Sequence, residues 1–288
     1  MKKYLVIGNP IGHSLSPLIH NYWMKKYHLI DSVYEKKKVE KKDLIGIVDQ
    51  VRSGEIKGVN ITVPYKKEII PLLDEIKGDA QLTQSVNTLC KVNNEVHGYN
   101  TDTKGFKYSL DDSHLPNNLE YNFVDCKNKN IFIIGAGGVT SSILEAFIDT
   151  ANKIYITNRT KEKAKELKKL GDISITLLGR KKNTIEVVEW GEKPEICDVV
   201  INTTSVGLTR DENLNLDFKD YQNNKNTLFY DLIYNPKETK FLKEARLRGN
   251  KTMNGKMMFI WQAQIAFHMW TGVEAEIDGD VIKLLNND

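Results

Sequence analysis

Short runs of apolar and β-branched residues alternate along this chain with stretches whose apolar positions recur every three or four residues. In the first third, the apolar runs predict strands near residues 3–7, 33–39, 58–63 and 85–92. The periodic stretches between them predict helices near residues 17–27, 41–52 and 66–76. This alternation is typical of α/β layers with mostly parallel sheets.

A polar, turn-rich segment at residues 111–118 interrupts the pattern and predicts a domain boundary. Beyond it, strands are expected near residues 131–134, 153–157, 173–177, 198–202, 227–231 and 250–253. Helices are expected at 257–270 and 278–285, and their apolar density predicts packing against a domain body. We therefore predict an α/β protein of two domains. One comprises residues 1–105 with the C-terminal helices of 257–288 packed back on it, and the other comprises residues 106–256.

Composition and charge indicate a soluble globular protein and argue against nucleic acid as a partner. The 288 residues are 40% hydrophobic and 27% charged, which suits a soluble globular protein. The formal net charge is only +3, and no basic tract interleaves with aromatic residues, so nucleic acid is not expected as a partner.

Cysteine content and hydropathy predict a cytoplasmic protein. The three cysteines are far apart and include no C-x-x-C pair, which argues against a disulfide framework or a zinc site and favours a reducing compartment. The apolar stretch at 257–270 contains Gln262, Gln264 and His268, so we expect no membrane-spanning segment.

Two serines lie in the loop that follows the first apolar run. Ser14 and Ser16 stand between the expected strand at 3–7 and the expected helix at 17–27. Hydroxyl groups beside the N–H groups of a helix start are suited to a small anion such as a carboxylate. The alternative is that Ser16 only caps the helix, with Pro17 at its first position, but capping accounts for one serine and not for two.

A glycine-rich turn follows the apolar run at 131–134. Gly135-x-Gly137 before a helical pattern matches the first half of the G-x-G-x-x-G/A fingerprint of a Rossmann-like domain. Small residues let the backbone approach a pyrophosphate, and Gly138 adds room. Thr140 takes the place of the last Gly or Ala, which predicts slightly looser packing of helix against strand.

The next strand indicates which dinucleotide is bound. An NAD site normally has Asp or Glu at the end of this strand, but the chain has Asn158-Arg159-Thr160 there. Arginine can bind a 2′-phosphate through two hydrogen bonds, so NADP is predicted as the cofactor. Lys163 is either a second positive charge at this site or a helix-surface residue.

Three further polar runs lie beside extended segments. They are Gly58–Lys66, Ser85–Thr88 and Gly98–Asp102. The ends of parallel strands converge on one crevice, so we expect these polar side chains to meet there.

With the runs at 201–207 and 231–236, these motifs make the chain resemble the shikimate dehydrogenase family from residue 4 to about residue 272. The resemblance implies an NADPH-dependent, reversible reduction of 3-dehydroshikimate to shikimate, a step of aromatic amino-acid biosynthesis. It implies Lys66 and Asp102 at the reacting carbon and Ser14 and Ser16 at the substrate carboxylate. It also implies further substrate contacts at Thr62, Asn87, Tyr234 and Gln262. The expected cofactor contacts are Gly135, Ala136, Gly137, Gly138, Val139, Asn158, Arg159, Thr160, Lys163, Thr204, Leu232 and Gly255.

These residue types suit the implied chemistry. Reducing a ring ketone requires a hydride on carbon and a proton on oxygen, and the Lys66 ammonium can polarise the carbonyl and supply the proton. No metal is predicted, because His13 and His20 lack carboxylates at ligand spacing. The chain departs from the family pattern at Thr103, where glycine is common, and at Lys256-Met257, within a run that is usually Asp-Gly-x-Gly-Met-Leu.

Two other functions are compatible with this sequence. One is a quinate/shikimate dehydrogenase that uses NAD or NADP, and the other is a non-catalytic nucleotide-binding sensor on the same fold. The presence of both Lys66 and Asp102 argues against a sensor, which needs no proton donor. We expect a small-molecule substrate, no membrane partner, and a monomer or homodimer.

Overall fold

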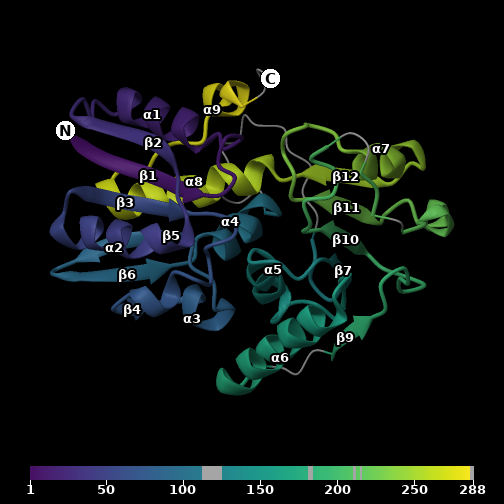
Figure 1. The fold of residues 1–288 in the computed structure, drawn as a ribbon. Helices are drawn as coiled ribbons and strands as arrows, with labels where there is room; N and C mark the ends of the chain where they lie inside the picture. The colour runs from purple at the N-terminus through teal and green to yellow at the C-terminus, as the bar shows by residue number, and fades with distance from the viewer. Residues whose placement is uncertain (112–124, 181–183, 210–211, 215, 286–288) are drawn as a thin grey trace. The chain divides into compact units, whose positions relative to one another are not determined.

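The chain divides into two units, each built on a six-stranded sheet (Figure 1). The computed structural model describes residues 1–111, 125–180, 184–209, 212–214 and 216–285. Of these, residues 1–105 and 260–285 form the first unit, and residues 106–111 and 125–259 form the second.

The sheet of the first unit is mixed. Its strands are β1 (Lys2–Gly8), β2 (Ser32–Lys38), β3 (Ile56–Ile61), β4 (Glu75–Ile76), β5 (Thr88–Val92) and β6 (Glu95–Tyr99). Their order across the sheet is β2-β1-β3-β5-β6-β4. β5 is antiparallel to both β3 and β6, whereas β1, β2 and β3 are parallel. The start of β5 therefore lies beside the ends of β3 and β6.

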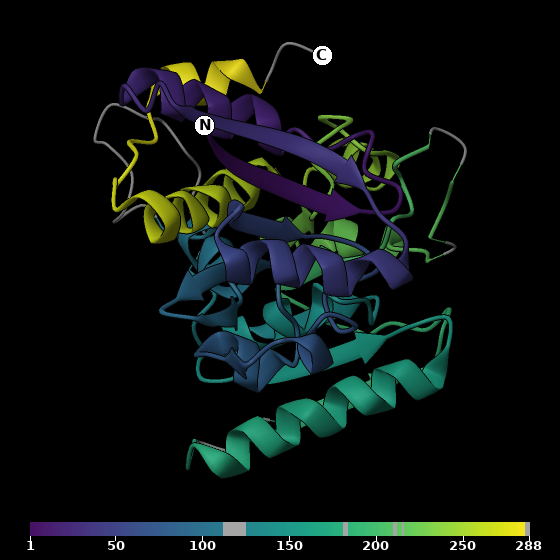
Figure 2. The ribbon, with the colours of Figure 1, turned by 60° about the vertical axis from the view of Figure 1, so that its left-hand side comes forward.

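Each face of this sheet is covered by helices. α2 (Leu44–Ser53) packs on one face, where alternate residues Leu5 and Ile7 of β1 join its apolar side. On the other face lie α1 (Ser16–Lys26) and α8 (Lys256–Thr271), and Figure 2 shows α9 (Gly279–Leu284) beside α1. Shorter elements are η1 (Lys41–Asp43), η2 (Ile70–Leu72), α3 (Asp79–Thr83) and α4 (Asp102–Ser109).

Helix α8 contributes a large part of the first unit's core. The Trp270 indole lies so close to Gly58 on β3 that a Cβ there would stand 2.3 Å from the ring, and Trp270 Nε1 donates to the Leu89 carbonyl. Phe267 lies against the rings of His20 and Trp23 on α1. The prediction that the C-terminal helices pack on the N-terminal domain is confirmed.

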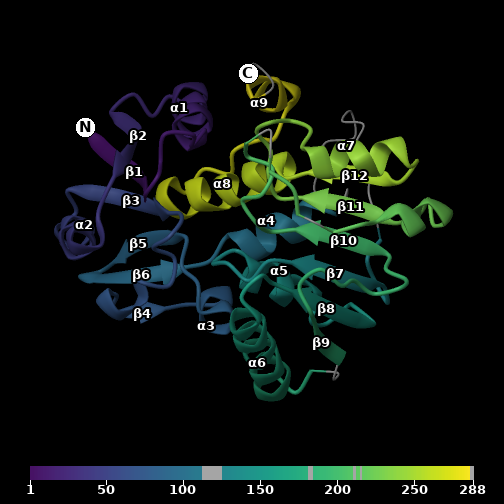
Figure 3. The same ribbon diagram turned by 45° about the vertical axis from the view of Figure 1, so that its right-hand side comes forward.

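The sheet of the second unit is entirely parallel. Its strands are β7 (Asn130–Ile134), β8 (Lys153–Thr157), β9 (Thr184–Val188), β10 (Val199–Asn202), β11 (Leu228–Asp231) and β12 (Lys251–Asn254). Figure 3 shows their order, β12-β11-β10-β7-β8-β9. This is the doubly wound arrangement of a Rossmann-like domain, and it confirms the predicted two-domain α/β class.

Helices lie on both faces of the parallel sheet. On one face, α7 (Lys240–Leu247) and the segment containing η3 (Lys219–Asn223) cover Phe132, Val200 and Phe229. On the other, Phe106 of α4 packs against Phe147 of α5 (Thr140–Phe147) and Tyr230 of β11. α6 (Lys161–Leu177) packs on α5 and β9.

The helix predicted at 66–76 is wrong. The segment forms turns, then η2, and ends in β4. Pro71 explains the break, because proline lacks the N–H that an α-helix needs and disfavours helical geometry in the residue before it.

The strand predicted at 173–177 is also wrong. These residues, three of them β-branched, form the last turns of α6, where Ser174 and Ile175 continue a buried stripe with Leu167 and Gly171. Packing of this stripe outweighed β propensity, and the edge strand β9 begins only at Thr184. The strand predicted at 85–92 begins later, at Thr88.

Most of the predicted boundary segment at 111–118 lies outside the described residues. Within the part of the chain that is described, no helix is long and apolar enough to cross a membrane.

Candidate functional site

The two serines of the first loop form a hydrogen-bonded pair. Ser14 Oγ donates to Ser16 Oγ at 3.2 Å and accepts from the Ser16 N–H at 3.3 Å. Ser16 is the first residue of α1, and its side chain does not cap the helix, so the capping alternative is wrong. Nor does α1 have an acidic residue in its first turn, which leaves its positive end open to an anion.

A buried polar network runs from Tyr34 to the middle of the sheet. The hydroxyl of Tyr34 donates to Asn60 Oδ1 at 2.6 Å. Asn60 Nδ2 donates to the Asn87 carbonyl and to the Thr88 hydroxyl, and Thr88 donates to Asn87 Oδ1. Asn60 and Thr88 face each other across β3 and β5, so strand register brings these groups together.

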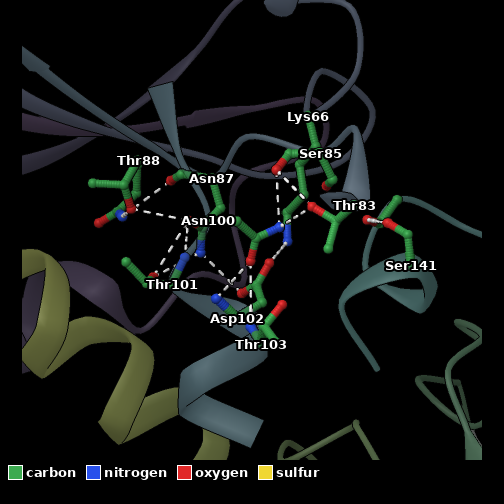
Figure 4. A network of polar contacts seen from close by, with 12 residues as sticks. Lys66, Thr83, Ser85, Asn87, Thr88, Asn100, Thr101, Asp102, Thr103 and Ser141 are labelled. Carbon is green, nitrogen blue, oxygen red and sulfur yellow. Dashed lines mark hydrogen bonds and ion pairs between the residues drawn. The ribbon is translucent and has the colours of Figure 1, made fainter. Parts of the chain in front are cut away.

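The network ends at a lysine–aspartate pair (Figure 4). Lys66 Nζ and Asp102 Oδ2 are 2.6 Å apart, and the two residues are only 9% and 5% exposed. Asn87 Nδ2 donates to the other carboxylate oxygen of Asp102 and to the Thr101 hydroxyl, both at 2.9 Å. Each charge is thus paired and hydrogen-bonded, which is the condition under which burying it is tolerated.

The start of α4 fixes the carboxylate. Asn100 Oδ1 accepts from the N–H groups of Asp102 and Thr103, so Asn100 caps this helix and Asp102 occupies its first turn. Thr103 is buried within the same turn. Thr103, which stands where the family commonly has glycine, therefore lies in the first turn of the helix that carries Asp102.

The convergence of polar strand ends is confirmed, although for a different reason from the one expected. Asn60 near the end of β3, Thr88 at the start of β5 and Tyr99 at the end of β6 are in register. An antiparallel strand reverses direction, so its start meets its neighbours' ends.

Thr62 and Gln262, the two remaining substrate contacts expected in this unit, lie outside this network on different elements. Thr62 follows β3, where its methyl group packs against Gly8, and its side chain is partly buried. Gln262 lies on α8 and is also partly buried.

The glycine turn of the second unit has the shape that a dinucleotide needs. Gly135 has φ = +118°, and a Cβ there would stand 2.4 Å from Thr203 Oγ1. At Gly137 a Cβ would meet nothing within 4 Å, so the backbone is open to an approaching ligand. Ala136, Gly138 and Val139 complete the turn before α5.

The looser packing expected at Thr140 is wrong. Thr140 is fully buried, and its hydroxyl accepts from the Gly137 N–H at 2.9 Å and bonds to Thr203 Oγ1 at 2.8 Å. It thereby joins the glycine turn to the segment after β10. Because the Gly137 N–H is used in this contact, a pyrophosphate would meet other groups of the turn.

Arg159 stands in the open at the end of β8. Its side chain is exposed and, among the described residues, has no hydrogen-bond or ion-pair partner. Asn158 donates to the Thr160 carbonyl, which shapes the loop. Lys163 is exposed on α6. An exposed guanidinium without a protein partner at this strand end suits a 2′-phosphate.

The remaining expected contacts follow β10, β11 and β12. Thr204 donates to Asn202 Oδ1, and Tyr234 stacks on Phe259 with ring centroids 4.6 Å apart. Gly255 lies against the Leu232 backbone, where a Cβ would stand 2.0 Å from the carbonyl oxygen. Glycine is therefore required at Gly255 despite the altered sequence that follows it.

Several network residues received no role in the sequence analysis. They are Tyr34, Asn60, Thr88, Asn100 and Thr101 in the first unit and Asn202, Asp231 and Thr239 in the second. One signal was available: Asn60, Asn202 and Asp231 are polar residues in or at the end of strands whose other buried positions are apolar, and burial there requires a partner.

A group of possible metal ligands lies elsewhere in the first unit. Glu75, Glu95 and His97 bring ligand atoms within 4.8 Å of one another. Glu75 is already paired with Lys77, and His97 bonds to Glu95 at 2.8 Å. Neither His13 nor His20 belongs to this group.

Family models match both units. Residues 6–89 match the shikimate dehydrogenase substrate binding domain, and residues 118–241 match the shikimate / quinate 5-dehydrogenase family.

Whole-length comparisons agree. The chain is 46% identical over 286 residues to a shikimate dehydrogenase (NADP(+)) of Pelagibacter ubique, covering 99% of both sequences. It resembles a crystal structure of shikimate dehydrogenase in complex with NADP+ (TM-score 0.84, 33% identity, 99% of this chain and 94% of the other). It also resembles the Thermus thermophilus enzyme in complex with NADP(H) and shikimate (TM-score 0.81, 27% identity, 99% of each chain). The chain therefore belongs to the shikimate dehydrogenase family.

Proposed function

We propose that this protein catalyses the NADPH-dependent, reversible reduction of 3-dehydroshikimate to shikimate. The observation that carries the proposal is the buried pair of Lys66 Nζ and Asp102 Oδ2, 2.6 Å apart, with Asn87 on the second carboxylate oxygen. A binding protein without catalytic activity has no use for a shielded ammonium at this position. The full-length relatives named for this activity support the same conclusion.

Lys66 is the proposed proton donor. Its ammonium would donate a hydrogen bond to the ketone oxygen, polarise the carbonyl and transfer a proton as the alcohol forms. Asp102 holds the ammonium in place, and Asn87 orients the carboxylate through Nδ2. In the reverse direction Lys66, as the neutral amine, would accept the hydroxyl proton.

The substrate carboxylate is proposed to bind at the Ser14–Ser16 pair. Both hydroxyls can turn toward an anion, and the uncapped start of α1 adds a favourable dipole. Thr62, Asn87 and Gln262 are proposed contacts of the ring hydroxyls, and Tyr234 is proposed to contact both substrate and cofactor.

The second unit is proposed to bind NADP. The turn at Gly135–Val139 would take the pyrophosphate, and Asn158–Thr160 with Lys163 would take the 2′-phosphate. Thr204, Leu232 and Gly255 would hold the nicotinamide end. When bound, the reduced cofactor supplies the hydride that the ring carbon accepts.

We propose that residues 1–105 with 257–288 act as the substrate domain and residues 106–256 as the NADP domain. The protein is proposed to act in the cytoplasm as a monomer or homodimer. Three free cysteines support a reducing compartment.

The direct test is oxidation of shikimate with NADP+, followed through the absorbance of the reduced nicotinamide. Quinate and NAD+ are tested in parallel. We expect turnover with shikimate and NADP+ at a kcat/KM at least about tenfold above the other combinations. Turnover of quinate with NAD+ alone would favour the quinate/shikimate alternative, and binding of NADP+ without any turnover would favour a sensor.

Replacement of Lys66 tests its role. Lys66→Met should lower kcat by about 10²- to 10⁴-fold because the proton donor is lost, while KM for shikimate stays within a few-fold. Lys67→Met, at the exposed neighbouring lysine, is the control and should retain wild-type kcat. A large rise in KM with kcat intact would make Lys66 a binding group only.

A further inference from the structure

The second unit contains a buried carboxylate that the proposed mechanism does not use. Asp231 ends β11, is fully buried, and accepts three hydrogen bonds. We propose that Asp231 is a positioning residue that ties together the two loops binding the nicotinamide end of NADP. This inference rests on the proposed function, since that function assigns Thr204, Leu232 and Tyr234 to the cofactor or its junction with substrate.

The first loop follows β10. Asn202 and Asp231 face each other across β10 and β11, and Asn202 Nδ2 donates to Asp231 Oδ1 at 3.0 Å. Asn202 Oδ1 accepts from both the N–H and the hydroxyl of Thr204, at 3.0 and 2.7 Å. Asn202 Nδ2 also reaches the Val206 carbonyl. The carboxylate therefore orients the amide that shapes this loop.

The second loop follows β11 itself. Asp231 Oδ1 accepts from the Ile233 N–H at 3.1 Å, and Oδ2 accepts from the Thr239 hydroxyl at 2.6 Å. Thr239 is also the N-cap of α7. Both ends of the segment that carries Leu232 and Tyr234 are thus fixed to one carboxyl group.

The charge of this group gives the arrangement a pH dependence. Burial raises the pKa of Asp231 to about 6, against the lowering effect of its hydrogen bonds from Thr239, Ile233 and Asn202. No charged side chain among the described residues of β10, β12 or α7 opposes this shift. On acidification one carboxylate oxygen gains a proton and becomes a donor, so it accepts the hydrogen bond from Thr239 or Asn202 much more weakly. NADP+ affinity should therefore weaken below about pH 6.

The test measures Kd for NADP+ by calorimetry, KM for NADP+ and for shikimate, and Tm, each between about pH 5 and pH 8. Asp231→Asn should raise Kd for NADP+ about tenfold near neutral pH and leave KM for shikimate within about twofold. It should also reduce the loss of affinity on acidification. The 2′-phosphate of NADP+ also titrates near pH 6. Its titration affects every variant equally, so the pH dependence of Kd for each variant is compared with that of the wild type.

Two further variants keep the test decisive. Thr239→Val removes one hydrogen bond from the carboxylate, so the fall in NADP+ affinity should begin at a higher pH than in the wild type. Thr227→Val is the matched control, since Thr227 is a buried threonine at the other end of β11, whose hydroxyl donates to the Cys197 carbonyl. It should lower Tm without changing Kd for NADP+.

Failure of the Asp231 inference and failure of the proposed function give different results. The inference is overturned if Thr239→Val leaves the pH profile of Kd unchanged, or if Asp231→Asn changes Tm alone. It is equally overturned if Thr227→Val raises Kd for NADP+ as much as Asp231→Asn does. A wild-type protein that binds NADP+ but does not oxidise shikimate would instead refute the proposed function, and the calorimetric comparison would still judge Asp231.

Discussion

At the scale of single residues, His20 is the most unusual group in the first unit. It is fully buried between α1 and β2, with its ring stacked on Tyr34 at a centroid distance of 4.2 Å. Neither ring nitrogen has a hydrogen-bond partner within the described part of the chain. Trp23, Phe267 and Trp270 surround it, so the imidazole is held neutral and serves to pack Tyr34, whose hydroxyl belongs to the polar network.

This burial makes stability depend on pH. Desolvation lowers the pKa of His20 to about 3, from 6.5 in the unfolded chain. Below about pH 6.5 the unfolded state binds a proton that the folded state does not, so the free energy of unfolding falls by about 1.4 kcal/mol per pH unit. His20→Phe, measured by urea unfolding, should lose about 2–3 kcal/mol less than the wild type between pH 7 and about pH 4.5.

The exposed His13 provides the control for that experiment, because His13→Gln should keep the wild-type pH dependence. Parallel curves for His20→Phe and the wild type would show that His20 does not contribute.

Arg159 is expected to select the cofactor. Its guanidinium is exposed at the end of β8, where the sequence Asn158-Arg159-Thr160 has no Asp or Glu for a ribose hydroxyl. Arg159→Gln should raise KM for NADP+ about tenfold and leave KM for NAD+ nearly unchanged, because only NADP+ carries the 2′-phosphate. Lys165→Gln, an exposed lysine on α6, is the matched control. Equal effects on both cofactors would remove the assigned role.

At the scale of elements, two glycines of the turn between β7 and α5 are needed for different reasons, Gly135 for folding and Gly137 for binding. Gly135→Ala places a methyl group 2.4 Å from Thr203 and forces alanine into a left-handed φ, so we expect Tm and NADP+ affinity both to fall. Gly137→Ala meets no protein atom within 4 Å, so Tm should hold while KM for NADP+ rises about tenfold or more. Thermal unfolding and steady-state kinetics together check both variants. An unchanged KM for Gly137→Ala would contradict the assigned pyrophosphate contact.

The elements also show which parts of the fold could be predicted. Strands with unbroken apolar runs, such as β7 and β10, were located to within a residue. The last turns of α6 were not, because their β-branched residues favour a strand, whereas Ser174 and Ile175 continue a buried stripe at helical spacing that only tertiary packing reveals.

Prediction of the site had a similar limit. Lys66, Asp102 and Asn87 could be singled out because they stand beside strand ends in motifs that resemble the family's, and the structure brings them together. Tyr34 could not, since it lies in a lysine-rich strand and its partner Asn60 is distant in sequence. Such contacts depend on how strands that are distant in sequence pair with one another, and this pairing cannot be read from a single sequence.

At the scale of the whole molecule, the first core is built from both ends of the chain. Trp270 packs against Gly58 and Tyr4 and lies beside His20, although more than 180 residues separate it from each of them. Trp270→Ala should therefore destabilise the first unit by about 3–5 kcal/mol.

Hydrogen exchange read by mass spectrometry can localise that loss. In Trp270→Ala, protection should fall in β1, β3 and α1 and persist in β7 and β10. Phe229→Ala, within the core of the second unit, should give the opposite pattern. Uniform loss of protection by either variant would contradict the division of the cores.

The discontinuous first unit also has a consequence for biosynthesis. A nascent chain leaves the ribosome from its amino terminus, and domains generally fold as soon as they are complete. Here the parallel sheet of the second unit has emerged in full once β12 is out, whereas the first unit still lacks Phe267 and Trp270. The first unit, although its sheet is translated earlier, thus completes its core only after the second unit's sheet has emerged, once α8 has followed β12.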